Sequence, residues 1–491
     1  MRLAATTATV LLATTAFAHA QARTDITIGM VLEPPSLDPT AEAAAAVDEV
    51  VYANVMEGLT RFAPDGSIQP GLARAWYASA DGTEYTFLLA DGVTFHDGTS
   101  FEASDVVFTL ERAMAEDSTN AQKGLFANIE SVEALNDLVV RITLGQPDGS
   151  LPFNLAWGDA VIVAPESAGT LATNPVGTGP FVFSEWRQGD SVTITRNDAY
   201  WGEPVALEEA TFRFISDPTA AFAAMMTGEV DAFPNFPAPE SLAQFAVDDR
   251  FRVIVGSTEG ETILAMNHTQ PPFDDVRVRQ AVAHAINRQD IIDGAMFGYG
   301  TPIGTHFAPH NPAYIDLTAL SPHNPVRAQE LLEEAGYPDG FETVLRLPPP
   351  SYARRGGEIV AAQLRAVGIE ARIENVEWAQ WLEQVFRNRD YGLTIVSHTE
   401  PMDIGIYARD DYYFGYESEA FDAIMEALGG ETDPGARVAL MQAAQEHIAR
   451  DYVNAYLFQL AKTGVADARI EGLWANSPTQ ANDLTAVTWR E

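Results

Sequence analysis

The alternation of short apolar strands with helices is the feature that most limits how this chain can fold. Between residues 212 and 233, a strand is followed by the helical segment PTAAFAAMMTGEV and then by a second strand. This order is typical of a βαβ unit. The same alternation returns after residue 324, with expected elements at 325–336 (helix), 341–347 (strand), 358–368 (helix), 369–374 (strand), 378–386 (helix), 391–397 (strand), 435–450 (helix) and 454–460 (strand). The pattern predicts two α/β lobes, which leave a cleft between them.

Alternating apolar residues predict further strands earlier in the chain, at 26–31, 85–89, 139–144, 192–195, 251–255 and 263–266. A helix is expected over 106–114, with Ser104 or Asp105 as its N-cap. His96 lies in the turn-rich segment DGVTFHDG just before this helix. We expect His96 to be a hydrogen-bonded structural residue.

The first residues have the pattern of an export signal. Arg2 precedes an apolar, Thr-rich run, and Ala18-His19-Ala20 fits a small-x-small cleavage site. We therefore expect residues 1–20 to be a signal peptide. A membrane anchor is the alternative, but the apolar run is shorter than the roughly 20 apolar residues that a spanning helix needs.

Composition excludes several classes of site and partner. The chain has no cysteine, so disulfides, thiol nucleophiles and cysteine zinc sites are excluded. It has 69 acidic and 29 basic residues, with a formal net charge of −40. The electrostatic field of this negative charge repels nucleic acid and anionic membranes, so we expect neither as a partner. A solvated acidic surface explains the excess better than an acidic functional patch does.

Common catalytic and cofactor motifs are missing. The sequence has no Gly-x-Ser-x-Gly elbow, no Gly-Lys dipeptide of a phosphate loop and no His-Glu-x-x-His. His306 and His310 are four residues apart, but Pro309 and Pro312 prevent the helix that would align them as metal ligands. We expect no cofactor and no metal. Paired carboxylates among the many acids would still serve a hydrolase.

Several long stretches occur in order along nearly the whole chain after residue 50: VYANVMEGLTRF, GLARAWYASADGTEYTFLLADGVTFHDGTSFEASDVVFTLERAM, NPVGTGPFVFSEW, NDAYWG, AAMMTGEVDAF, DVRVRQAVAHAINRQDII, AQELLEEAGYPDGF and AAQLRAVGIEARIENVEWAQWLEQ. Together they resemble the family 5 extracellular solute-binding proteins of ABC transporters, a family that includes dipeptide, oligopeptide, nickel and opine receptors. The resemblance implies a type II periplasmic binding protein fold, in the family 5 variant that has an extra subdomain in the first lobe.

The family layout predicts where the lobes begin and end. The first lobe is expected at 21–262, with the subdomain at about 49–180. The second lobe is expected at 263–464, and 465–491 is expected to return to the first lobe. The resemblance also implies a monomeric, non-enzymatic receptor in the periplasm, which holds a solute in the cleft and delivers it to a membrane permease. Closure requires the solute to contact both lobes, because a solute with equal affinity for the open and closed states would leave the equilibrium between them unchanged.

The resemblance also indicates residues of a binding site. Relatives hold a ligand carboxylate with an arginine in the loop before the helix at 358–368. Here the loop reads LPPPSYARR, and Arg354 and Arg355 come several residues later. The bidentate carboxylate clamp is therefore not expected. An acid after the following strand binds the ligand amino group in relatives, and here that loop offers His398, Glu400 and Asp403.

Each of these acids has an alternative role as a turn cap or a solvated group. Trp378 matches an aromatic that lies against ligand in relatives, whereas Trp381 is expected in the core. Glu33 and Trp157 match ligand-facing loops of the first lobe. Tyr412 belongs to an aromatic run at 412–414 that would line the cleft or pack in the core.

The acids and the missing clamp favour an amine-bearing solute, either a small peptide or an amino-acid derivative. Within the family, an opine, a sugar-like compound or a metal chelate is the alternative. A periplasmic hydrolase that uses Glu400 and Asp403 is the alternative from another class.

Overall fold

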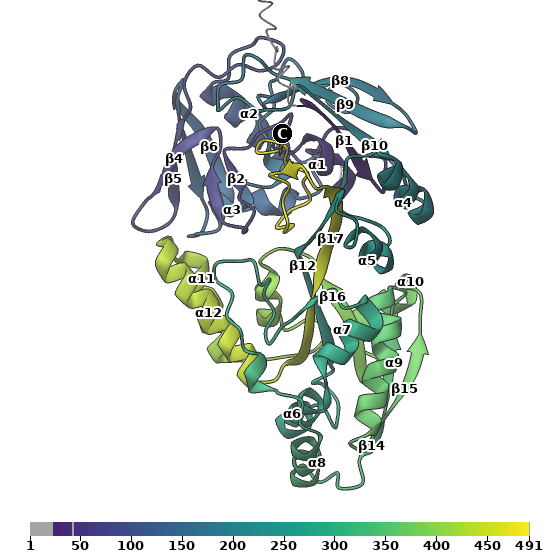
Figure 1. Ribbon diagram of the computed structural model, residues 1–491. Coiled ribbons are helices and arrows are strands. Elements are labelled where there is room, and N and C mark those ends of the chain that lie inside the picture. Colours follow the sequence, from purple (N-terminus) through teal and green to yellow (C-terminus); the bar gives the residue numbers. More distant parts are fainter. Residues whose placement is uncertain (1–22, 42–43, 491) are drawn as a thin grey trace, which may run out of the picture.

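The chain folds into two α/β lobes joined by long shared strands (Figure 1). The computed structural model describes residues 23–41 and 44–490, so the predicted signal peptide lies outside the described residues. An eleven-stranded mixed sheet passes through both lobes. Its strands are, in order, β15 (Ile369–Asn375), β14 (Phe341–Leu347), β16 (Leu393–His398), β12 (Phe251–Met266), β17 (Asn454–Asp467), β11 (Ala232–Phe233), β1 (Asp25–Met30), β10 (Glu209–Phe214), β9 (Ser191–Arg196) and β8 (Phe181–Arg187), with β13 (Thr301–Pro302) against β17. The predicted two-lobe α/β class is confirmed.

The antiparallel pair β12 and β17 connects the lobes (Figure 1). The sequence predicted two strands at 251–255 and 263–266, and this was wrong, because one strand covers both. The polar residues between them interrupt the apolar alternation. The pairing register with β17 also shifts there, between Ser257 and Glu261. On one side of this bulge Ile254 packs against a first-lobe core, and on the other Ile263 is buried in a second-lobe core. The predicted lobe boundaries stay predictions.

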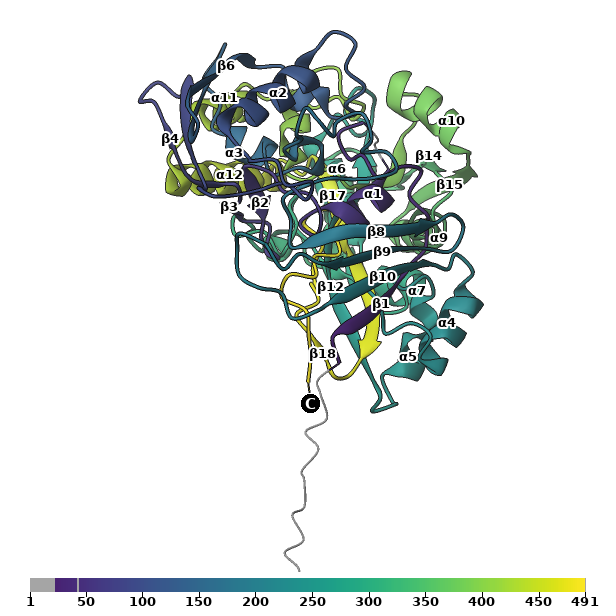
Figure 2. The ribbon, with the colours of Figure 1, turned by 90° about the horizontal axis from the view of Figure 1, so that it is seen from above.

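The first lobe contains the expected βαβ unit. β1 pairs in parallel with both β10 and β11, and α4 (Pro218–Thr227) lies between β10 and β11 in the sequence. Asp217 caps this helix by accepting a hydrogen bond from Ala220 N at 2.8 Å, and Gly228 ends it in the left-handed conformation. Viewed from above, α4 and α5 (Leu242–Phe245) lie together beside β1 and β10 (Figure 2).

A separate antiparallel sheet with its own core forms part of the first lobe. Its strands are β4 (Ala73–Ala78), β5 (Glu84–Leu89), β7 (Val139–Leu144) and β6 (Ile129–Asn136). Helix α2 (Ala103–Met114) packs on it, and its N-cap is Glu102 rather than Ser104 or Asp105, because Asp105 occupies position N3 of a capping box. His96 is confirmed as structural: its Nε2 lies 2.9 Å from Gly179 O, and its Nδ1 accepts a hydrogen bond from Gly177 N.

The second lobe has cores on both faces of the shared sheet. Along β12, Leu264 and Met266 belong to one core, and Ile263 and Ala265 belong to the other. This alternation follows from the two-residue period of a strand. The helices of the chain are α1 (Ala45–Val51), α2, α3 (Leu151–Asn154), α4, α5, α6 (Val276–Ala285), α7 (Arg288–Met296), α8 (Pro325–Glu334), α9 (Ser351–Arg365), α10 (Trp378–Trp381), α11 (Glu419–Gly430) and α12 (Pro434–Arg450). Two short pairs, β2 (Thr60–Phe62) with β3 (Ile68–Pro70) and β18 (Ile470–Glu471) with β19 (Thr488–Trp489), complete the strands.

Helix α9 begins well before the predicted start at residue 358. Gly356 and Gly357 both lie inside the helix. A Cβ at Gly357 would lie 2.3 Å from Leu347 Cδ1 of β14. This glycine therefore permits close approach of helix and sheet. None of the helices between residues 23 and 490 has the length and apolar character needed to cross a bilayer.

Candidate functional site

A cleft of about 780 Å³ lies between the four-stranded subdomain and the second lobe. Its walls are mainly apolar, with Ile68, Trp76 and Phe153 on the first-lobe side and Met402, Met425 and Val438 on the other. This volume is in the range of small-molecule sites. The lobes touch beside it, where Gly149 N donates to Gly429 O at 2.9 Å and Arg437 Nη2 donates to Ser150 Oγ at 3.0 Å. Figures 1 and 2 show the subdomain directly above α11 and α12.

A small polar pocket adjoins the cleft. It shares Asn311 and Met402 with the cleft wall. Its other polar lining residues are Glu259, Glu261, His306 and Asp403. Glu259 and Glu261 come from the bulged part of β12, so the pocket lies where that strand passes between the lobes.

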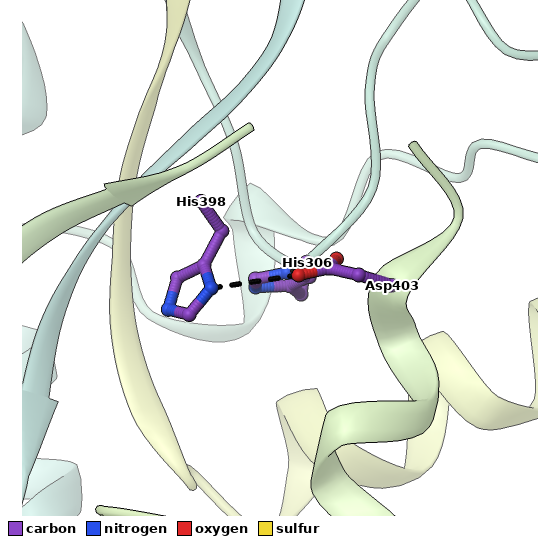
Figure 3. A group of neighbouring side chains, drawn as sticks. All are labelled: His306, His398 and Asp403. Atoms are coloured by element: carbon purple, nitrogen blue, oxygen red, sulfur yellow. Dashed lines mark hydrogen bonds and ion pairs between the residues drawn. The ribbon is translucent and has the colours of Figure 1, made fainter. Parts of the chain in front are cut away.

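His306, His398 and Asp403 converge on one point (Figure 3). His306 lies in the loop after β13, His398 is the last residue of β16, and Asp403 begins the helical turn Asp403–Ala408. His306 Nε2 is 2.7 Å from Asp403 Oδ1, and His398 Nδ1 is 3.4 Å from Asp403 Oδ2. The two histidines are buried, and the Asp403 side chain is 13% exposed. Both oxygens of this carboxylate therefore face a ring nitrogen.

Tyrosine hydroxyls contact the outer nitrogens of both histidines. His306 Nδ1 is 3.1 Å from Tyr407 Oη, and His398 Nε2 is 3.1 Å from Tyr413 Oη. Tyr412 Oη lies 3.5 Å from His398 Nδ1, and Tyr412 is buried among the aromatic residues of the second lobe. Tyr412 therefore belongs to the wall of this cluster and to the core.

Two carboxyl groups of the pocket, those of Asp403 and Glu261, have pKa values shifted in opposite directions. Burial would by itself raise the pKa of Asp403, but the charges and hydrogen bonds of His306 and His398 hold this pKa below its ordinary value. Burial and the negative charge of Asp403 raise the pKa of Glu261 well above its ordinary value. Glu261 is 3% exposed, and its Oε2 has no hydrogen-bond partner among the described residues.

His306 and His310 do not act together. As predicted, the residues between them form bends and turns rather than a helix. His310 Nε2 lies 2.7 Å from Glu259 Oε1, and its Nδ1 lies 2.7 Å from Ser257 Oγ. His306 and His310 therefore contact different carboxylates, those of Asp403 and Glu259.

Two of the predicted second-lobe residues are exposed. Glu400 accepts a hydrogen bond from the adjacent Thr399 N at 3.1 Å. Trp378 is 41% exposed and packs edge-on against Trp381, which is 4% exposed. The core position predicted for Trp381 is confirmed. Contact of Glu400 or Trp378 with a solute stays a prediction.

The predicted first-lobe residues lie away from the histidine cluster. Glu33 Oε1 accepts hydrogen bonds from Trp186 Nε1 at 3.0 Å and Gly189 N at 2.9 Å, both in the β8–β9 hairpin. Trp157 packs edge-on against Phe153, a residue of the cleft wall. The structure thus brings together His398, Asp403 and Tyr412 but not Glu33, Trp157 and Trp378.

Asp159, a buried acid in the first-lobe turn Gly158–Ala160, leads to a stability prediction. Burial raises the pKa of Asp159 to about 6, and its Oδ1 has no partner in the part of the chain that is described. Because the folded protein favours the neutral form of Asp159, this carboxyl contributes fully to the free energy of unfolding below its unfolded pKa of about 3.9. The contribution is lost as the pH rises through about 6. We expect Asp159→Asn to raise the free energy of unfolding by about 1 to 3 kcal/mol at pH 7.5, with little effect near pH 4. Urea denaturation at the two pH values measures this, and equal effects at both would contradict it.

Comparison with known proteins places the chain in a family. It matches the family model described as bacterial extracellular solute-binding proteins, family 5 middle, over residues 67–419. The chain belongs to this family. It is 32% identical over 373 residues to the glutathione-binding protein GsiB of Salmonella paratyphi A, covering 74% of this chain and 72% of that protein. The predicted family and its two-lobe binding-protein fold are confirmed.

Solved structures agree with this assignment. HbpA2 from Haemophilus parasuis has a TM-score of 0.88 at 25% identity, covering 95% of this chain and 100% of that one. The periplasmic binding protein DppA from Helicobacter pylori, in complex with the peptide STSA, has a TM-score of 0.73 at 25% identity, covering 96% and 99%. The family consists of solute-binding proteins.

Sequence reasoning missed Glu259 and Glu261, and it considered His306 only together with His310. One signal was present for the two glutamates. The polar segment GSTEGET interrupts an otherwise apolar strand pattern, and such interruptions often mark bulges near functional sites.

Proposed function

We propose that the protein is the periplasmic receptor of an ABC importer and that it captures a small peptide or amino-acid-derived solute bearing an amine. The observation that carries this proposal is the cleft of about 780 Å³, which is lined from both lobes and adjoins a pocket of buried carboxylates. A solute that bridges the two walls favours the closed form, which a membrane permease then recognises. The receptor acts as a monomer and is exported by its signal peptide.

The distribution of charge supports a solute with an amine at one end. Asp403, Glu259 and Glu261 lie together at the polar pocket, which has no room for a water molecule in this structure, so an ammonium group would give Glu261 Oε2 a donor only after the pocket opens. In contrast, Arg354 is engaged by Glu377 Oε1 at 3.1 Å, which agrees with the absence of a carboxylate clamp in this loop.

The cleft wall has a cation of its own. Arg437 is the charged residue of that wall within the described chain. It donates to Glu431 O at 2.8 Å and to Ser150 Oγ at 3.0 Å, at the contact between the lobes. A solute with an amine at the polar pocket, an apolar body and a carboxylate toward Arg437 has the polarity of a peptide. The relatives GsiB, a glutathione-binding protein, and DppA, whose structure holds a peptide, support the same class.

A hydrolase is disfavoured. Both oxygens of Asp403 face histidine nitrogens and its pKa is lowered, so this carboxyl is a poor general acid. Glu400 is exposed. An opine, a sugar-like compound and a metal chelate are the other outcomes of the test below.

Native mass spectrometry of freshly purified protein tests the proposal, followed by calorimetric titration with glutathione and a panel of dipeptides and tripeptides in chelator-treated protein. We expect one bound solute with a primary amine, released unchanged. A solute with no positive group, or chemical turnover of the bound compound, would overturn the proposal.

Closure of the lobes is a further expected result. The best-binding peptide of that panel should reduce the radius of gyration in small-angle scattering, because it contacts both walls of the cleft. At 100 times its Kd it should stabilise the fold by about 2.7 kcal/mol, since it binds only the folded protein. An unchanged scattering profile at saturation would contradict closure, while a raised melting temperature alone would still indicate binding.

A further inference from the structure

We propose that His306, His398 and Asp403 form a binding site for one divalent transition-metal ion, such as Zn²⁺. Each of the three side chains offers a ligand atom, and these atoms all lie within 4.8 Å of one another. Imidazole nitrogens and a carboxylate oxygen are preferred zinc ligands. The ion and the ammonium group of the proposed solute would compete for Asp403, so they are alternative occupants of this pocket, and the solute titrations therefore use chelator-treated protein.

The distances fit one ion after a small adjustment. Two ligands of a tetrahedral zinc ion, with bonds of about 2.0 to 2.1 Å, lie about 3.4 Å apart. His398 Nδ1 and Asp403 Oδ2 are already 3.4 Å apart, and His306 Nε2 and Asp403 Oδ1 are 2.7 Å apart. For an ion between the three groups, His306 and Asp403 must separate by less than about 1 Å, and the ligand nitrogens of the two histidines, which lie within 4.8 Å of each other, must also come to about 3.4 Å.

The outer contacts of both histidines match those of metal ligands. A ligating histidine uses one ring nitrogen for the metal and the other for a hydrogen bond that fixes its orientation. Here the inner nitrogens, Nε2 of His306 and Nδ1 of His398, face Asp403. The outer nitrogens contact the hydroxyls of Tyr407 and Tyr413, both at 3.1 Å. Asn454 Nδ2 in turn donates to Tyr407 Oη at 3.1 Å, which holds the hydroxyl that contacts His306 in place.

Glu261 is a second, independent observation that points to a cation. Glu261 is only 3% exposed, and it lines the same small pocket as His306 and Asp403. Its Oε2 has no hydrogen-bond partner within the described chain. A buried carboxylate without a partner is destabilising. A divalent ion bound by the three residues would place a positive charge close to the Glu261 carboxyl group, which lines the same pocket.

Zinc titration of the full-length mature protein tests the site, after chelator treatment and with any affinity tag removed. We expect one Zn²⁺ per chain by calorimetry and elemental analysis. Cobalt(II) should give the visible absorption of tetrahedral coordination in the unsubstituted protein, so this arm needs no variant. His398→Gln and Asp403→Asn should each raise the zinc Kd at least tenfold, and Glu261→Gln should also raise it.

His447→Gln is the matched control. His447 Nε2 lies 3.4 Å from Asp451 Oδ2, so this substitution removes the histidine of another His–Asp pair that has no third ligand in the described residues. Its zinc Kd should equal that of the unsubstituted protein. Absence of zinc binding, or equal zinc Kd values in His398→Gln, Asp403→Asn and the control, would overturn the site. An unchanged Kd in Glu261→Gln alone would overturn the role of Glu261.

Discussion

Asp403→Asn is expected to weaken binding of the amine-bearing solute at least tenfold in chelator-treated protein. Asp403 is 13% exposed and lies at the polar pocket beside the cleft. Removing a carboxylate partner from a buried ammonium group costs about 2 to 5 kcal/mol, against about 0 to 1 kcal/mol for an exposed pair. A tenfold change corresponds to about 1.4 kcal/mol, so the expected effect is well above that of a surface acid.

Calorimetric titration of the solute identified by native mass spectrometry measures this effect. Asn keeps an oxygen that can accept from His306, so we expect the unliganded variant to remain folded, but with a lower melting temperature because the charge that faces both histidines is lost. Glu400→Gln should have a smaller effect because Glu400 is exposed. Asp411→Asn, an acid 79% exposed in the following loop, is the matched control. Unchanged affinity in both Asp403→Asn and Glu400→Gln would show that these acids do not bind the solute.

Local sequence patterns predicted the regular elements well where burial is regular. The strand at 341–347 has the predicted bounds, and its buried residues Leu345 and Leu347 are separated by the less buried Arg346, as the two-residue period of a strand requires. The pattern failed at β12, where one strand contains a bulge between two buried ends. It also failed at the start of α9, which begins at Ser351 rather than at the predicted residue 358 and contains Gly357, packed closely against Leu347. In both cases the local sequence has no clear preference for helix or strand, and a contact with a distant part of the chain determines the structure.

The candidate site was predictable only in the part that is continuous in sequence. His398, Asp403 and Tyr412 come from one segment that follows a buried strand, and the structure keeps them together. His306 reaches Asp403 because β13 pairs with β17 and places the following loop at the end of β16. Glu261 reaches the same pocket through the bulge of β12. No local pattern encodes these long-range contacts, although the family resemblance implied the cleft.

Trp381→Ala is expected to lower the free energy of unfolding by about 3 to 5 kcal/mol, the range for truncation of a buried aromatic residue. Trp381 is 4% exposed, and its ring contacts Phe386 and Tyr413. Its Nε1 donates to Thr394 Oγ1 at 2.9 Å. Removal of the indole therefore leaves a cavity in the aromatic core that surrounds His398, and it also removes a hydrogen bond from β16.

Trp378→Ala is the matched comparison, because the same residue type lies three positions earlier and is 41% exposed. We expect its free energy of unfolding to change by no more than about 0.5 kcal/mol. If Trp378 lies against an ammonium-bearing solute, as the family resemblance implies, its loss should weaken solute binding by about 0.5 to 2 kcal/mol. Urea denaturation and calorimetric titration of both variants separate the two roles. Unchanged solute affinity in Trp378→Ala would remove Trp378 from the site, and a small loss of stability in Trp381→Ala would contradict the packing of this core.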